Sequence, residues 1–182
     1  MQQLISLLVD NESGALMRVA GVLTSRGYNI ESLTVAKTLD PTLSSMTIVA
    51  NVNDAGRELL IKQITRLVNV IKAVDLSDSN AVRRELALIK VYVSQENRAG
   101  LLKEAEIFGA RVVDAAPSSY TLEVTSSPDK LDALISLLHH YGQVEIIRSG
   151  AMAMARARRN KLPLPKFSDV DISEPVKETV ET

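Results

Sequence analysis

Several residue types are rare or missing in this sequence, and each absence narrows the classes of function that fit it. The 182 residues contain no cysteine, which excludes disulfide bonds, thiolate nucleophiles and cysteine-ligated metals and fits a reducing compartment. Tryptophan is absent and aromatic residues make up only 3%, so we expect an aliphatic core and no surface that stacks nucleobases. The net charge of -1 gives no electrostatic reason to expect a nucleic-acid partner.

Long hydrophobic runs are missing as well. The apolar residues 4–9 are followed at once by Asp10, Asn11 and Glu12 and have no basic region before them, which is not the pattern of a signal peptide. No apolar run approaches the roughly 20 residues that span a bilayer. We therefore expect a cytoplasmic protein with no membrane partner.

The hydrophobic residues that are present predict the same series of elements twice. Residues 4–9, 28–37, 46–53 and 70–76 have the apolar patterns of strands, and helical spacing occurs near residues 16–23 and 54–68. The pattern returns in residues 86–93, 95–109, 110–115, 118–126, 131–138 and 143–150. The order βαββαβ is the ferredoxin-like arrangement, so we predict an α+β fold of two such modules.

We place the first module at residues 1–76, a linker at 77–83, the second module at 84–160 and a tail at 161–182. Residues 162–182 of this tail contain three prolines and five acidic against two basic residues without apolar periodicity, so we expect the tail to be disordered. Strands 4–9 and 86–93 are apolar on both faces, whereas the helices of each module cover one face only. Pairing of sheets between modules or chains solves this, so we expect a dimer.

Catalytic and metal-binding residues are not evident. His139 and His140 are neighbours on one helix, so their side chains point about 100° apart and cannot serve one site; we interpret them as helix-end cations. The carboxylate pairs Glu104/Glu106 and Asp129/Asp132 fall on predicted helices without a nearby basic or metal-ligand partner, so we interpret them as solvated faces. We interpret the basic cluster at 156–161 as a solvated segment or a protein contact. We expect no autonomous enzyme activity and no metal site.

The turn before the first helix is the remaining candidate. The first N–H groups of a helix lack partners within it and carry partial positive charge, and Gly14 at that place lets a ligand approach the backbone. Asn11 adds an amide oxygen that can accept a hydrogen bond from an ammonium group. These groups describe a site for an apolar amino acid. Alternatively, Ser13 caps the helix and the turn is a plain connection.

Longer stretches resemble a known family. The segments "NESGALMRVAGVLTSRGYNIESLTVAKTLDPTLSSMTI", "RRELALIKV", "FGARVVDAAPSSYTLEVT", "KLDALI" and "VEIIRSG" resemble the small, regulatory subunit of acetohydroxyacid synthase (acetolactate synthase) across residues 2–158. The resemblance implies that the first module is an ACT domain and the second an ACT-like C-terminal domain. Ser13, Met17, Lys37 and Ser45 depart from the common pattern of that family.

The resemblance implies a function without catalysis by this chain. Such subunits bind and activate a catalytic subunit that carries thiamine diphosphate, magnesium and FAD, and they confer feedback inhibition by valine or a related branched-chain amino acid. An alternative is an ACT-domain sensor that acts in transcriptional control. The effector-binding residues implied between paired ACT domains are Asn11, Gly14, Ala15 and Leu16 of one chain with Asn29 and Ile30 of a second chain. The contacts implied with the catalytic subunit are Thr34, Lys37, Asp40 and Ser45.

Overall fold

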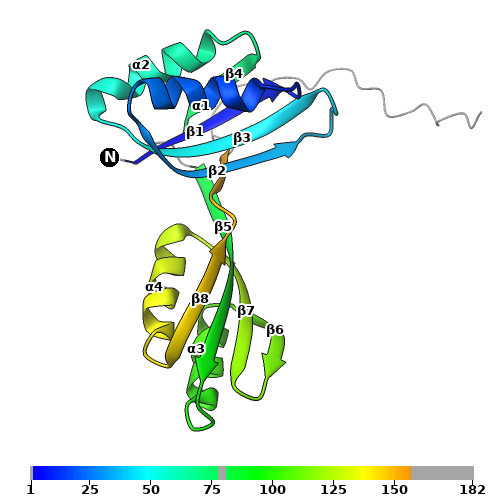
Figure 1. The fold of residues 1–182 in the computed structure, drawn as a ribbon, viewed down its shortest axis with the longest axis vertical. Coiled ribbons are helices and arrows are strands. Elements are labelled where there is room, and N and C mark those ends of the chain that lie inside the picture. Colours follow the sequence, from blue (N-terminus) through cyan, green and yellow to red (C-terminus); the bar gives the residue numbers. More distant parts are fainter. Residues whose placement is uncertain (1, 78–80, 157–182) are drawn as a thin grey trace, which may run out of the picture.

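The computed structural model describes residues 2–77 and 81–156, which form two modules (Figure 1). The first contains two helices and four strands in the order β1α1β2β3α2β4. Their bounds are β1 Gln2–Asp10, α1 Ala15–Ser25, β2 Asn29–Lys37, β3 Leu43–Asn51, α2 Asp54–Thr65 and β4 Val70–Asp75. The strands form one antiparallel sheet in the order β2-β3-β1-β4, which is the predicted ferredoxin-like arrangement.

The helices of the first module cover one face of its sheet. The apolar residues of β1 and β3 that point to this face pack against the apolar stripes of α1 and α2. The buried side chains include Ile5, Leu7, Val19, Leu23, Met46, Ile48, Leu60 and Ile64. The helical spacing at Val19 and Leu23 therefore faces the core, as the sequence predicts.

The second module repeats the plan. Its elements are β5 Ala81–Val93, α3 Arg98–Ile107, β6 Arg111–Ala116, β7 Ser119–Ser126, α4 Pro128–Leu138, β8 Gly142–Arg148 and β9 Met152–Ala155. Four strands form an antiparallel sheet in the order β6-β7-β5-β8, and α3 and α4 cover the same face of it (Figure 1). The core contains Ile89, Val91, Leu101, Leu122, Leu131, Leu134 and Leu138.

The junction between the modules differs from the expected linker at 77–83. Strand β5 begins at Ala81, and its first residues pair with β9, Arg84 opposite Met152 and Ala81 opposite Ala155. Strand β9 was missed because its four residues, MAMA, carry no alternating or turn signal. The residues that follow the second sheet thus fold back to pair with the strand that enters it.

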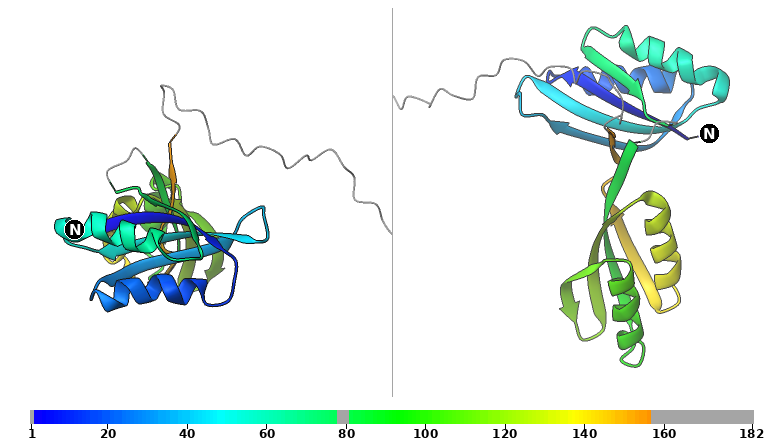
Figure 2. Two further views of the ribbon diagram at one scale, coloured as in Figure 1. Left: turned by 90° about the horizontal axis from the view of Figure 1, so that it is seen from above. Right: turned by 180° about the vertical axis from the view of Figure 1, so that it is seen from behind.

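The helix-free face of the first sheet is turned toward this junction (Figures 1 and 2). Leu4 and Val49 on that face are buried together with Leu76 and with Ala151 of the segment before β9. The helix-free face of β1 is therefore partly covered by residues of the same chain. The sequence predicted that either the other module or a second chain would cover this face. At Leu4 and Val49 the residues that follow the second sheet cover it.

Two predicted features lie wholly or partly outside the described residues: the tail at 161–182 and most of the basic cluster at 156–161. Within the described ranges, no helix is long and apolar enough to cross a membrane.

Candidate functional site

Gly14 forms the junction between the turn after β1 and helix α1. It adopts the left-handed conformation, with φ of 88° and ψ of -9°, and no side chain caps the helix. The alternative in which Ser13 caps α1 is therefore not realised. An ideal Cβ placed on Gly14 would have no heavy atom within 4 Å, so the space in front of the turn is open. The left-handed backbone conformation favours glycine here, whereas crowding does not.

The first amides of α1 differ in what they bind. The Ala15 N–H donates to the Glu12 carbonyl oxygen at 3.2 Å, and the Arg18 N–H donates to the Gly14 carbonyl oxygen at 3.0 Å. Within residues 2–77 and 81–156, the N–H groups of Gly14 and Leu16 donate to no acceptor. Of the three predicted backbone donors, Ala15 is thus engaged, whereas Gly14 and Leu16 are available to an anion.

Asn11 lies beside the β2–β3 hairpin. Its Nδ2 donates to the Pro41 carbonyl oxygen at 2.9 Å, and its Oδ1 accepts from the Ser44 hydroxyl at 3.2 Å. The Asn11 N–H donates to the Thr42 carbonyl oxygen at 2.7 Å. A carbonyl oxygen accepts two hydrogen bonds, so Oδ1 retains one for an ammonium group. The fixing of Asn11 by Ser44 was missed in the sequence, since the two lie 33 positions apart.

Asn29 and Ile30 begin β2, directly after helix α1 and the turn that follows it. They are therefore at the opposite end of α1 from Gly14 (Figure 1). A helix of 11 residues is about 16 Å long at 1.5 Å per residue, which is much longer than a branched-chain amino acid. One chain does not bring the two predicted halves of the site together.

The predicted contacts with a catalytic partner divide into two groups. Lys37, Asp40 and Ser45 are exposed on the β2–β3 hairpin. Hydrogen bonds from the side chain and the N–H of Thr42 lower the pKa of Asp40. Thr34 instead faces the second module, where its hydroxyl donates to the Ser149 carbonyl oxygen at 3.4 Å.

The equivalent turn of the second module is built differently. Helix α3 begins at Arg98, so Gly100 lies inside the helix and not before it. A Cβ on Gly100 would approach the Tyr141 ring to 3.0 Å, so this glycine allows a side chain to pack. The two modules thus share the order of strand, turn and helix, but the glycine has a different structural role in each.

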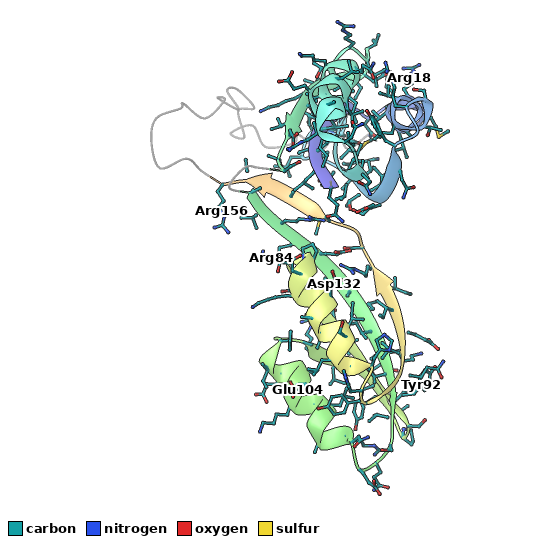
Figure 3. The ribbon with its side chains drawn as sticks, turned by 90° about the vertical axis from the view of Figure 1, so that its left-hand side faces the viewer. Arg18, Arg84, Tyr92, Glu104, Asp132 and Arg156 are labelled. Carbon is teal, nitrogen blue, oxygen red and sulfur yellow. The ribbon has the colours of Figure 1, made fainter. Side chains whose placement is uncertain are left out.

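Two of the other polar candidates, His140 and Asp132, have structural partners. The His140 ring nitrogen Nδ1 lies 3.1 Å from the Leu137 carbonyl oxygen at the end of α4. Asp132, at the end of α4 nearest the first module (Figure 3), pairs with Arg148 at 2.6 Å, and Arg148 also pairs with Glu85 at 2.7 Å. The interpretation of Asp132 as a carboxylate without a basic partner was wrong.

In the part of the chain that the structure describes, no three histidine or carboxylate side chains are grouped so as to hold a metal ion.

Comparison with known families gives a match for each module. Residues 5–72 match a family described as the AHAS small subunit-like ACT domain, and residues 84–157 match one described as the small subunit of acetolactate synthase. Together the two matches include nearly all of the residues from β1 to β9. Both modules, and not the ACT module alone, have counterparts in these subunits.

Individual relatives agree over almost their whole length. The acetolactate synthase small subunit of Haemophilus influenzae is 44% identical over 163 residues, which are 89% of this chain and 100% of the relative. The isozyme 3 small subunit of Escherichia coli is 41% identical over 157 residues, 86% of this chain and 96% of that one. The crystal structure of the acetolactate synthase small subunit from Thermotoga maritima superposes with a TM-score of 0.77 at 34% identity, covering 87% of this chain and 99% of the other.

Proposed function

The chain belongs to the family of acetolactate synthase small subunits, and we propose that its ACT module senses a branched-chain amino acid for the catalytic subunit. Family membership makes it a regulatory subunit in branched-chain amino acid biosynthesis that has no catalytic activity of its own and associates with the catalytic subunit. It also favours this function over the alternative of a transcriptional sensor. Thiamine diphosphate, magnesium and FAD are proposed for the catalytic partner.

The open turn at Gly14 is the observation that supports the effector site best. The N–H groups of Gly14 and Leu16 are available, and there is free space where a Cβ would stand. Partial positive charge at this helix end suits a carboxylate. Asn11 Oδ1 keeps one lone pair for an ammonium group. The proposed ligand is therefore valine or a related branched-chain amino acid.

A homodimer completes the proposed site. Gly14 and Asn29 are separated by the length of α1, so a ligand between them needs a second copy of the chain. Strand β2 is at the edge of the sheet, with only β3 beside it, and a nine-residue edge strand is a template for pairing. Val35 on β2 and Met17 on α1 are exposed by 43% and 72%. Pairing along β2 would cover this apolar surface.

The effector acts by differential affinity. An amino acid held between two ACT modules favours one arrangement of the dimer, and that preference is transmitted as coupling of about 1–3 kcal/mol. The test is to add the purified chain to the acetolactate synthase catalytic subunit and to measure activity with and without valine, leucine or isoleucine. The proposal predicts activation by the chain and inhibition by at least one of the three. No change under any condition would contradict it.

A further inference from the structure

Asn69 lies in the turn between α2 and β4 and makes three hydrogen bonds to the segment that carries Gly14. Its backbone carbonyl oxygen accepts from the Asp10 N–H at 2.9 Å. Its side-chain Nδ2 donates to Glu12 Oε2 at 3.1 Å, and its Oδ1 accepts from Arg18 Nη1. Asp10 ends β1 before the turn, Glu12 is within the turn, and Arg18 is in helix α1 after it; Arg18 is labelled in Figure 3. Asn69 therefore joins all three parts.

The chemistry of these contacts requires an amide. The Arg18 guanidinium only donates hydrogen bonds, and the Glu12 carboxylate only accepts them when ionised. A neutral side chain between them must accept on one side and donate on the other. An asparagine amide does both, and the charged neighbours fix which end faces which.

Burial makes the arrangement specific. Asn69 is only 4% exposed, so an unmade hydrogen bond at its side chain is not replaced by water without cost. Glu12 and Met17 by contrast are exposed, and no side chain caps α1. The conformation of the turn thus depends on a buried residue that is remote in sequence.

We propose that Asn69 is a positioning residue for the effector turn, acting through Asp10, Glu12 and Arg18 without touching the ligand. The effect on ligand binding rests on the proposed function of the ACT module. The effect on the turn itself does not, since it follows from contacts within one chain. The two parts are therefore tested separately.

The variant is Asn69→Ala, and Asn53→Ala is its matched control. Asn53 is also an asparagine of the first module, and its side chain accepts from the Gly56 N–H at 2.9 Å to cap α2. Each substitution removes an amide that fixes a backbone segment, but only Asn69 contacts the turn. A third variant, Asn69→Asp, keeps the size of the side chain and an acceptor for Arg18 but removes the donor to Glu12.

The first measurement is amide hydrogen exchange of the full-length chain without effector. Asn69→Ala should speed exchange in residues 10–18 and leave the start of α2 unchanged, whereas Asn53→Ala should do the reverse. Unchanged exchange in residues 10–18 of Asn69→Ala would overturn the positioning role, whether or not any amino acid binds.

The second measurement is calorimetric titration of the same proteins with L-valine, L-leucine and L-isoleucine. Asn69→Ala should weaken binding about fivefold, the size expected for one net hydrogen bond, while Asn53→Ala stays within about twofold of the original chain. Asn69→Asp should not recover the loss, because an ionised aspartate accepts from Arg18 but cannot donate to Glu12 and repels its carboxylate. Full recovery by Asn69→Asp would contradict the requirement for an amide. Equal weakening by both alanine variants would show a general loss of stability and contradict the proposal. Absence of binding by the unsubstituted chain would instead contradict the proposed function, and with it the ligand part of this inference.

Discussion

The Thr34 hydroxyl on β2 donates a hydrogen bond to the Ser149 carbonyl oxygen of the second module at 3.4 Å. Beside it, the Ala151 N–H donates to Ser32 Oγ at 3.3 Å. Gly150 lies between these contacts with φ of +80°, and a Cβ there would be 3.1 Å from the Thr34 hydroxyl oxygen. Because β2 also carries the second half of the proposed effector site, these contacts join that site to the second module.

Replacing Gly150 with Ala should weaken the effector response of the holoenzyme. The added Cβ strains the left-handed backbone and pushes against β2, so the modules lose their close contact. Valine should still bind to the full chain within about twofold, but maximal inhibition should fall because coupling is a separate quantity from affinity. The control is Gly109→Ala, which has φ of +72° and open space around the Cβ. Undiminished inhibition in Gly150→Ala would contradict this route of coupling.

The ion pair of Arg148 with Glu85 should stabilise the second module. Glu85 has a side-chain exposure of only 8% and receives two hydrogen bonds from Arg148, at 3.0 and 2.7 Å. Hydrogen bonding to Glu85 is the main cause of the raised pKa of Arg148. Arg148→Met would leave the carboxylate buried and unpaired, at a cost of about 2–3 kcal/mol, somewhat less than for a fully buried pair. Denaturant unfolding of the full chain measures the loss.

Asp132→Asn is the control for that substitution. Asp132 also pairs with Arg148, but its side chain is 61% exposed, so its loss should cost below about 1 kcal/mol. If Arg148→Met and Asp132→Asn lowered the free energy of unfolding equally, the burial of Glu85 would not be the cause of the destabilisation.

Asp75 should make the stability of the first module depend on pH in the acid range. Burial acts to raise the pKa of Asp75, but hydrogen bonds from Ser77 and Gln3 and the charge of Arg57 outweigh it, so the pKa is lowered. The stabilisation is therefore present above the unfolded-state pKa and is lost as the pH falls through the folded-state pKa.

The matching variant is Asp75→Asn. It should unfold at lower denaturant than the original chain at pH 7, and the difference should shrink below about pH 4, where an unfolded aspartate becomes protonated. A difference that stays constant between pH 7 and pH 3 would mean that ionisation of Asp75 contributes nothing.

Val35→Lys should weaken the proposed dimer. The substitution places a charge on the exposed part of edge strand β2, where a second β2 would bring a like charge close to it. Sedimentation velocity of the full chain should show a shift from dimer toward monomer. Val68→Lys is the control, because Val68 is 92% exposed and precedes β4 at the other edge of the sheet. If both variants sediment like the original chain, pairing does not use β2.

Much of the fold could be predicted because its signals are local. The stripe at Val19 and Leu23 and the alternation at Met46 and Ile48 each follow from which residues face one core. Strand β9 could not be predicted, since its pairing with β5 depends on residues about 70 positions away. The cover of Leu4 by Ala151 is a long-range contact of the same kind.

The site was predictable to the same extent. Gly14 is recognisable because a glycine between a strand and a helix has a local cause. The roles of Ser44 and Asn69 were not, because each meets the turn only after the chain has folded. Asp132 on α4 was misread for the same reason, since its partner Arg148 lies on strand β8, 16 positions further along the chain.

The most direct test of the account is calorimetric titration of L-valine into the full-length chain with Gly14→Asp and Gly14→Asn. Asparagine tolerates the left-handed backbone and adds bulk without charge, whereas aspartate also repels a carboxylate. Gly109→Asp, at φ of +72° with open space, controls for backbone strain. The account predicts binding by the original chain and by Gly109→Asp, weaker binding by Gly14→Asn, and at least about tenfold weaker binding by Gly14→Asp, which corresponds to about 1.4 kcal/mol. Valine binding by Gly14→Asp as tight as that of the original chain would contradict it.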